Sequence, residues 1–280
     1  MPVINTNTSA QYAQDALKVN AKTMSTAMQQ LATGNRINAA KDDAAGLSIG
    51  QNMTSQVRGL NQAVRNVNDG INLLQTADGA LVETSNMLQR MRELAVQSSN
   101  ATNSPSQRTY LNNEFKSLQV EIDRIADNTT WNSTKLIAGS GTTSMAFVFQ
   151  AGMNSGQLIT VGLDNMNSSA LGIGLTSTTS GASITTFGAS QSAITSIDAA
   201  IEIVNLGRSS MGATMNQLSY SADNMVNIST NIAASRSSIM DTDYATASAT
   251  LSKSQIIQQA ATAMLAQANQ QPQSVLSLIK

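Results

Sequence analysis

The sequence predicts a mainly α fold, a long antiparallel coiled-coil or helical-bundle rod formed by both chain ends, with a small β-hairpin region in the middle. Three observations predict it. The 280 residues include three prolines, so few positions interrupt a helix. Apolar residues recur in alternating steps of three and four, the spacing of a coiled-coil seam. Aromatic residues make up 3% of the chain, which leaves close packing to small residues, Leu and Met.

Five apolar stripes predict the helices. They run through residues 17–31, 53–74, 111–125, 194–239 and 257–278, and polar residues interrupt the fourth and fifth. A narrow stripe of this kind is unstable unless another helix covers it, so the two ends of the chain are expected to pair. The stripe positions are Leu17, Ala21, Met24, Met28, Leu31; Met53, Val57, Leu60, Val64, Val67, Ile71, Leu74; Leu111, Phe115, Leu118, Ile122, Ile125; Ile194, Ile197, Ile201, Val204, Arg208, Met211, Met215, Leu218, Ala222, Met225, Ser229, Ile232, Arg236, Ile239; and Ile257, Ala261, Met264, Ala268, Val275, Leu278.

Polar and Gly-rich segments separate the stripes. Residues 98–107 are expected to form a turn. At its end, Ser104 and Gln107 flank Pro105 in the pattern of a capping box that starts a helix. Residues 145–150 and 157–163 alternate as the strands of a β-hairpin. The Ser/Thr/Gly-rich residues that follow, 164–183, are expected to form a surface loop.

Composition excludes several classes of function. The chain has no His and no Cys, which removes Ser-His-Asp and Cys-His catalysis, zinc sites of the usual kind and disulfides. We therefore expect no enzyme, no cofactor and no metal. The net charge of −1 gives no electrostatic reason to bind nucleic acid. No apolar run is long enough for a membrane span, and the first twenty residues do not resemble a Sec signal peptide.

Two acidic pairs and one basic patch are the remaining candidate sites. Adjacent helical side chains diverge too far for Asp42 and Asp43 to share one ion well. We therefore expect solvated or structural carboxylates, with Asp42 or Asp43 paired to Lys41 or Arg36. Asp241 and Asp243, at an expected break between helices, are interpreted as capping or hinge residues.

Residues 88–97, LQRMRELAVQ, place Arg92 at an expected seam position. This segment is either a solvated helix face or a surface for a neighbouring protein, and composition alone does not decide between them.

Several long segments resemble bacterial flagellins. INTNTSA near the start, LATGNRINAAKDDAAGLSIG (31–50), NDGINLLQTADGAL (68–81) and LQRMRELAVQSSN (88–100) resemble the N-terminal region of that family. Residues 236–280 resemble its C-terminal region, and FQAGMNSGQLITVGL (149–163) is similar to its β-hairpin segment. The resemblance covers nearly the whole chain apart from about 164–190.

The resemblance implies a structural subunit that polymerises into the extracellular flagellar filament for swimming motility. Residues 1–40 with 245–280 would form the terminal coiled coil of the inner core, and 41–163 with 190–244 the helical shaft and hairpin of the outer tube. Residues 164–189 would be a short variable loop in place of outer domains, which makes this a short form. Segments near 32–45 and 236–250 would join the two layers.

The resemblance also implies partners. They are other copies of the chain in a helical homopolymer, the flagellar type III export apparatus whose channel secretes it, a secretion chaperone, and filament cap and hook-junction proteins. Host Toll-like receptor 5 would contact the 88–97 patch, with Gln89, Arg90, Leu94, Gln97 and Glu114 as the subunit and receptor contacts. The inner-core assembly residues, on the terminal stripes except for Leu265, which lies beside one, are Leu17, Met24, Met28, Leu31, Ile257, Met264, Leu265, Val275 and Leu278.

The chain departs from the family pattern at a few positions. Gln217 and Ser238 stand where Arg is common, and Ala247 stands where Glu is common. Trp131-Asn132-Ser133 replaces the usual Phe-Asn-Gly. At Gln217, Ser238 and Ala247 the family's charged side chain is absent, so each position lacks a candidate subunit contact. We expect these differences to affect the helical form of the filament and the strength of receptor binding.

Three alternatives are weighed against a filament subunit. A hook–filament junction protein of the same family shares the terminal helices but usually matches the C-terminal motif less closely. A non-enzymatic coiled-coil signalling or interaction protein of the chemoreceptor type would need a membrane span. A flagellin with an inserted peptidase would need zinc ligands that a chain without His cannot supply.

Overall fold

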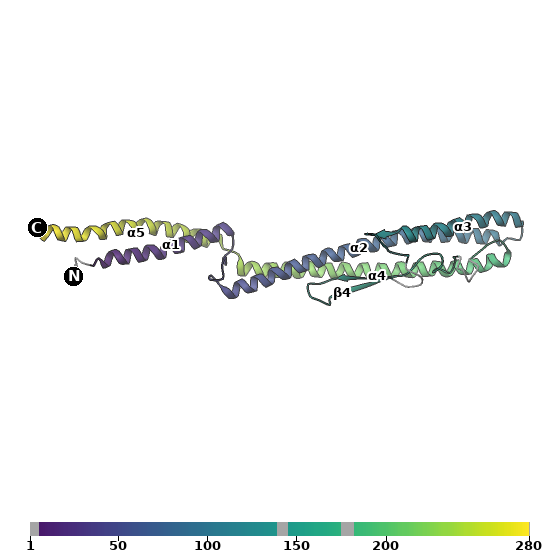
Figure 1. Ribbon diagram of the computed structural model, residues 1–280, viewed down its shortest axis with the longest axis horizontal. Helices are drawn as coiled ribbons and strands as arrows, with labels where there is room; N and C mark the ends of the chain where they lie inside the picture. Colours follow the sequence, from purple (N-terminus) through teal and green to yellow (C-terminus); the bar gives the residue numbers. More distant parts are fainter. Residues whose placement is uncertain (1–5, 139–144, 175–181, 280) are drawn as a thin grey trace. The chain divides into compact units, whose positions relative to one another are not determined.

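The computed structural model describes residues 6–138, 145–174 and 182–279, with side chains described up to residue 270. It is mainly helical, as predicted, with two small antiparallel sheets (Figure 1). The helices are α1 (Thr8–Thr33), α2 (Ala44–Ser98), α3 (Pro105–Asn128), α4 (Phe187–Met240) and α5 (Tyr244–Ile279). The strands are β1 (Thr130–Trp131), β2 (Thr134–Lys135), β3 (Met145–Gln150) and β4 (Leu158–Leu163).

The chain forms two compact units. Residues 1–57 and 230–280 make one, called here the terminal unit, and residues 58–229 make the other, called the central unit. These boundaries lie within α2 and α4, whereas the division expected from the sequence, at 40/41 and 244/245, follows the breaks between helices.

In the terminal unit, α1 and α5 lie side by side and run in opposite directions (Figure 1). Asn7 Nδ2 donates a hydrogen bond to the Ala268 carbonyl over 2.9 Å, and Asn20 Nδ2 donates to the Ser254 carbonyl over 2.7 Å. As the residue number rises along α1, that of its partner on α5 falls. The predicted pairing of the two chain ends is therefore confirmed.

Backbone hydrogen bonds join the two connections of the terminal unit, residues 34–43 and 241–243. Gly34 ends α1 with a φ of 72°, a left-handed conformation that suits glycine. The Thr242 N–H donates to the Gly34 carbonyl over 2.9 Å, and the Arg36 N–H donates to the Met240 carbonyl over 2.6 Å. A Cβ on Gly34 would also lie 3.0 Å from the Tyr244 hydroxyl, so a larger residue would require that side chain to move.

The central unit contains the main hydrophobic core, which α2, α3 and α4 surround (Figure 1). The stripes predicted at 53–74, 111–125 and 194–239 are buried or half-buried at every position, which confirms them. Polar contacts fix the antiparallel register of α2 and α4, among them the half-buried ion pair of Arg208 Nε with Asp78 Oδ1 at 2.8 Å. The largest fully buried side chains all belong to this unit: Phe115, Leu74, Leu81, Leu88, Met91, Leu94, Ile122, Leu136, Ile137, Leu163, Met166 and Ile173.

The predicted start of α3 and the predicted hairpin are both confirmed. Ser104 Oγ accepts from the Gln107 N–H, and the Gln107 side chain accepts from the Ser104 N–H, which completes the capping box. Strands β3 and β4 pair antiparallel from Met145↔Leu163 to Gln150↔Leu158. The hairpin packs closely on α2, because a Cβ on Gly70 would lie 3.2 Å from the ring of Phe149.

The prediction of a surface loop at 164–183 is wrong for residues 165–173. Met166, Leu171 and Ile173 are buried, and the Asp123 carboxylate on α3 accepts from both the N–H and the hydroxyl of Ser168 over 2.7 Å. Gln119, also buried on α3, donates to the Ile173 carbonyl over 2.5 Å. These long-range contacts fold a Ser/Gly-rich segment into the core. Residues 175–181 lie outside the described part.

The short β1–β2 hairpin places Asn132 and Ser133 at φ values of 46° and 65°. A two-residue turn of this kind requires positive φ at both positions, where Asn-Gly is the favoured pair. Asn tolerates this conformation, but Ser carries a steric cost that Gly does not.

Ser133→Gly should therefore stabilise the central unit by about 0.5–1 kcal/mol. A rise of roughly 1–4 °C in the thermal midpoint, followed by circular dichroism, would show it. Asn132→Gly is the matched control and should gain less. A Ser133→Gly protein that melts at or below the wild-type temperature would contradict this account of the turn.

Candidate assembly surfaces

The contact between α1 and α5 is built from small and polar residues. Ala10, Asn20 and Ala27 are the buried residues of α1, and Ala247 and Ser254 are the buried residues of α5 within its described side chains. Small side chains let helix backbones approach closely, but they remove little apolar surface from water. Because the stabilisation scales with that area, this pair is held far more weakly than the central core.

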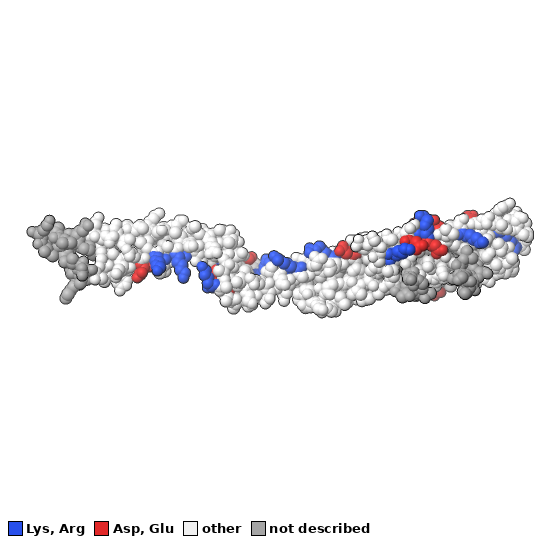
Figure 2. Space-filling model, in the orientation of Figure 1, with Lys and Arg blue, Asp and Glu red and all other residues white. Residues whose placement is uncertain are grey.

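Large apolar side chains on the same two helices point to solvent. On α1, Tyr12 is 78% exposed and Val19 is 67% exposed. On α5, Ile256 is 67% exposed and Met264 is 66% exposed. We call the apolar side chains that α1 and α5 turn away from their mutual contact the outer faces of the pair. Figure 2 shows the surface over α1 and α5 as mostly uncharged, with one short row of basic side chains.

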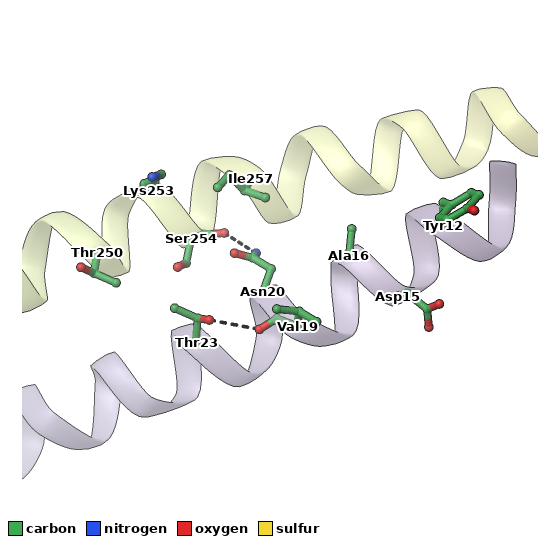
Figure 3. Close-up of a pocket in the computed structure, with 10 residues that line it drawn as sticks. All are labelled: Tyr12, Asp15, Ala16, Val19, Asn20, Thr23, Thr250, Lys253, Ser254 and Ile257. Atoms are coloured by element: carbon green, nitrogen blue, oxygen red, sulfur yellow. Dashed lines mark hydrogen bonds between the residues drawn. The ribbon is translucent and has the colours of Figure 1, made fainter. Parts of the chain in front are cut away.

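A groove runs along the two helices (Figure 3). Tyr12, Val19 and Ile257 contribute apolar surface to its lining, and Asp15 and Lys253 contribute charge. At its floor, Asn20 donates to the backbone of Ser254 across the pair. An exposed apolar groove flanked by a few charges is typical of a protein–protein contact surface.

The predicted inner-core residues fall into three groups. Leu17, Met24, Leu31 and Leu265 are half-buried, toward the contact between α1 and α5. Met28, Ile257 and Met264 are exposed, so they belong to the outer faces and not to the contact within the chain. The side chains of Val275 and Leu278 lie outside the described part.

Sequence reasoning missed the residues at the centre of this contact, Asn20, Ala27, Ala247 and Ser254. The predicted α1 stripe includes Ala21 and Met28, which are exposed, because a seam sought in apolar residues alone passes over the buried Asn20. The observed line, through Ala10, Leu17, Asn20, Met24 and Ala27, shares Leu17 and Met24 with the prediction but has Asn20 and Ala27 in place of Ala21 and Met28. The available signal was that Ala10 and Ala27 share a helix face with Leu17 and Met24.

The 88–97 patch lies over α2 and α3 of the central unit. Arg90 pairs with Glu114 of α3 and with Glu93, each over 2.9 Å. The hydrogen bond with Glu93, then that with Glu114, raises the pKa of Arg90 above its ordinary value. Gln89 and Gln97 are exposed beside this cluster.

Two expectations about this patch are wrong. Leu94 is 1% exposed, so it is a core residue and not a surface contact. Arg92 does not occupy the seam, since it is exposed and its Nε lies 2.6 Å from Asp198 Oδ1 on α4. The buried line on α2 runs through Leu88, Met91 and Leu94 instead, and Arg92 lies beside it.

One carboxylate of each acidic pair caps a helix, Asp43 at α2 and Asp243 at α5. Asp43 Oδ1 accepts from the Gly46 N–H at the start of α2 over 2.9 Å, and Asp42 accepts from the Ala39 N–H over 3.0 Å. The expected pairing of these carboxylates with Lys41 or Arg36 is therefore wrong, because both carboxylates accept from backbone N–H groups instead.

Asp243 caps α5, as expected. Hydrogen bonds from the Thr246 hydroxyl, then from the N–H groups of Thr246 and Ala245, lower its pKa. Asp241 accepts from the Ser237 hydroxyl over 2.6 Å. Within the described residues, no three acidic side chains gather into a cluster that could hold a metal ion.

Two family models match the two parts of the chain that supply these surfaces. The bacterial flagellin N-terminal helical region matches residues 4–142, and the bacterial flagellin C-terminal helical region matches residues 194–279. The chain belongs to the bacterial flagellin family. It is therefore a structural subunit of the flagellar filament, an extracellular surface structure.

Individual flagellins match along their full length. A flagellin of Halalkalibacterium halodurans is 45% identical over 278 residues, which cover 99% of this chain and 100% of that one. Flagellin A of Vibrio cholerae is 36% identical over 379 aligned residues, with 99% of each chain covered. The crystal structure of Bacillus cereus flagellin is 32% identical, with a TM-score of 0.50, and covers 61% of this chain and 94% of that one.

These matches decide between the alternatives. Full-length identity to flagellins favours a filament subunit over a hook–filament junction protein. Membership of the flagellin family sets aside a signalling protein of the chemoreceptor type. Among the described helices, none has the length and apolarity needed to cross a membrane.

Proposed function

We propose that this chain polymerises by burying the outer faces of α1 and α5 against neighbouring copies, and that the two helices become fully ordered only in the filament. The exposed side chains of Val19, Ile256 and Met264 carry this proposal. Apolar side chains that stay in water within one chain gain free energy when another chain covers them. Contacts that repeat without closing a ring produce a helical filament.

The weak pairing of α1 with α5 supports the second half of the proposal. The buried positions of α1 are two alanines and one asparagine, so little apolar area offsets the entropy of ordering the helices. Neighbouring copies would supply the missing burial, and ordering would then be linked to polymerisation. In this scheme Leu17, Met24, Leu31 and Leu265 hold the pair together, while Met28, Ile257 and Met264 meet other subunits.

The proposal extends to partners and route. Family membership supports export through the flagellar channel by the type III apparatus, with a chaperone on the C-terminal helix before export, and contacts with cap and hook-junction proteins in the filament. The exposed residues Gln89, Arg90, Gln97 and Glu114 form the candidate contact for Toll-like receptor 5. In this proposal the chain acts by packing against neighbouring subunits and catalyses no reaction. Residues 1–40 with 245–280 form the inner core of the filament.

Substitution on the outer face tests the proposal. Ile256→Ser should remove about 2 kcal/mol of burial in the filament and raise the critical concentration for seeded polymerisation roughly thirtyfold. The measurement is the concentration of protein left in solution after filaments have grown from seeds.

Gln255→Ser is the matched control, because Gln255 is an exposed polar neighbour on the same helix. It should leave the critical concentration within about twofold of wild type, and neither change should alter thermal unfolding of the central unit. Polymerisation of Ile256→Ser at the wild-type critical concentration would count against burial of this face.

A further inference from the structure

Helix α5 contains a proline where an unbroken helix needs an N–H. Pro272 lies inside α5 (Tyr244–Ile279), and proline has no backbone N–H to donate. In an α-helix the N–H of each residue bonds to the carbonyl four residues earlier. The Ala268 carbonyl therefore has no donor from position 272 within its own helix.

Asn7 supplies a donor to that carbonyl from the other helix. Its Nδ2 lies 2.9 Å from the Ala268 carbonyl oxygen. Its Oδ1 accepts from the Ala10 N–H over 3.0 Å and so caps the start of α1. Since one partner is a donor and the other an acceptor, the two bonds together fix which way the amide faces. One side chain thus serves two backbone groups that lack a helical partner, the Ala10 N–H at the start of α1 and the Ala268 carbonyl inside α5.

The bond between Asn20 and Ser254 provides a contrast within the same pair of helices. Asn20 Nδ2 also donates to an α5 carbonyl, that of Ser254, over 2.7 Å. The residue four positions further along is Gln258, which has a backbone N–H. The Asn20 bond is therefore additional to the helical one, whereas the Asn7 bond replaces one that proline removes.

We propose that Asn7 is a positioning residue that couples the start of α1 to the proline in α5. Its amide lets α5 continue past Pro272 and sets the register in which the two chain ends pair. The coupling makes each end depend on the other, so neither end of the chain orders alone. The inference rests on the proposed function, because the terminal helices are taken to order during polymerisation.

A double-mutant cycle with Pro272→Ala tests the coupling. Asn7→Asp keeps the cap on α1, since Asp accepts at this position as well as Asn does, but it cannot donate to Ala268. In the wild-type background this leaves a carbonyl unpaired, and the critical concentration for seeded polymerisation should rise about tenfold. In the Pro272→Ala background the helix supplies its own N–H, and Asn7→Asp should change the critical concentration less than about twofold.

Two further variants serve as controls. Asn7→Ser keeps a cap without introducing a charge, and it should show the same dependence on position 272. Asn20→Ala should change the critical concentration by the same factor in both backgrounds, because its bond does not depend on Pro272. Equal effects of Asn7→Asp with and without the proline would overturn the inference.

Failure of the proposed function would give a different result. If wild-type protein does not extend seeds, polymerisation through these helices is contradicted. The coupling can still be tested in the monomer, where it predicts that Asn7 stabilises the paired helices. The same cycle is then scored by amide hydrogen exchange in residues 244–270 of the monomer. Loss of protection by Asn7→Asp that Pro272→Ala rescues supports the coupling, and loss without rescue overturns it.

Discussion

Removal of residues 261–280 should leave a soluble, partly helical monomer that does not polymerise. The deletion takes away the C-terminal part of α5, including Leu265, which is half-buried toward α1, and Met264, which is exposed. It also removes the Ala268 carbonyl to which Asn7 donates. Both the pairing of the chain ends and the surface for neighbouring copies are then lost, while the central core keeps all of its large buried side chains.

Two measurements on the truncated protein separate these effects. Electron microscopy after seeding should show no filaments at concentrations at which the full chain forms them. Thermal unfolding of the central unit should stay within a few degrees of wild type, because no residue of that unit is changed. Filaments formed by the truncated chain would show that the end of α5 is not needed for assembly.

Phe115→Ala should cause the largest loss of stability from a single substitution. Phe115 lies on α3, is fully buried, and shares the core of the central unit with Ile122 and the buried line of α2. Removal of a buried Phe costs about 3–5 kcal/mol, since its contacts disappear and a cavity remains. Urea unfolding followed by circular dichroism should show the loss as a lower midpoint at unchanged slope.

Tyr110→Ala is the matched control for this change, because Tyr110 is an aromatic residue on the same helix that is 72% exposed. It should shift the free energy of unfolding by no more than about 0.5 kcal/mol. If both substitutions cost the same, the core is not where the structure places it.

The central helices were predictable because their seams carry large residues. Leu60, Val67 and Leu74 recur on α2, and Val204, Met211 and Leu218 recur on α4, so the apolar stripe and the buried line coincide. On α1 and α5 they separate. The buried line there passes through Asn20 and Ser254, while large apolar side chains such as Val19 and Ile256 face outward, so a search for apolar residues selects positions from both faces.

The remaining differences arise from contacts between residues far apart in the chain. Asp123 and Gln119 on α3 hold residues 168 and 173 in place, and nothing local in that Ser/Gly-rich segment signals it. Leu94 is buried although its neighbours Arg92 and Glu93 are exposed, in a part of α2 that contacts α3 through Arg90 and Glu114. Local composition cannot reveal which side a distant helix covers.

Amide hydrogen exchange of residues 8–33 and 244–270, compared between monomer and filament under the same conditions, tests the central claim most directly. Burial of the outer faces by neighbouring copies predicts rapid exchange in the monomer and slow exchange in the filament. Amides around Leu81 and Leu88 in the central core should be protected in both states, since their burial does not depend on assembly. Equal protection of the terminal helices in monomer and filament would contradict the account.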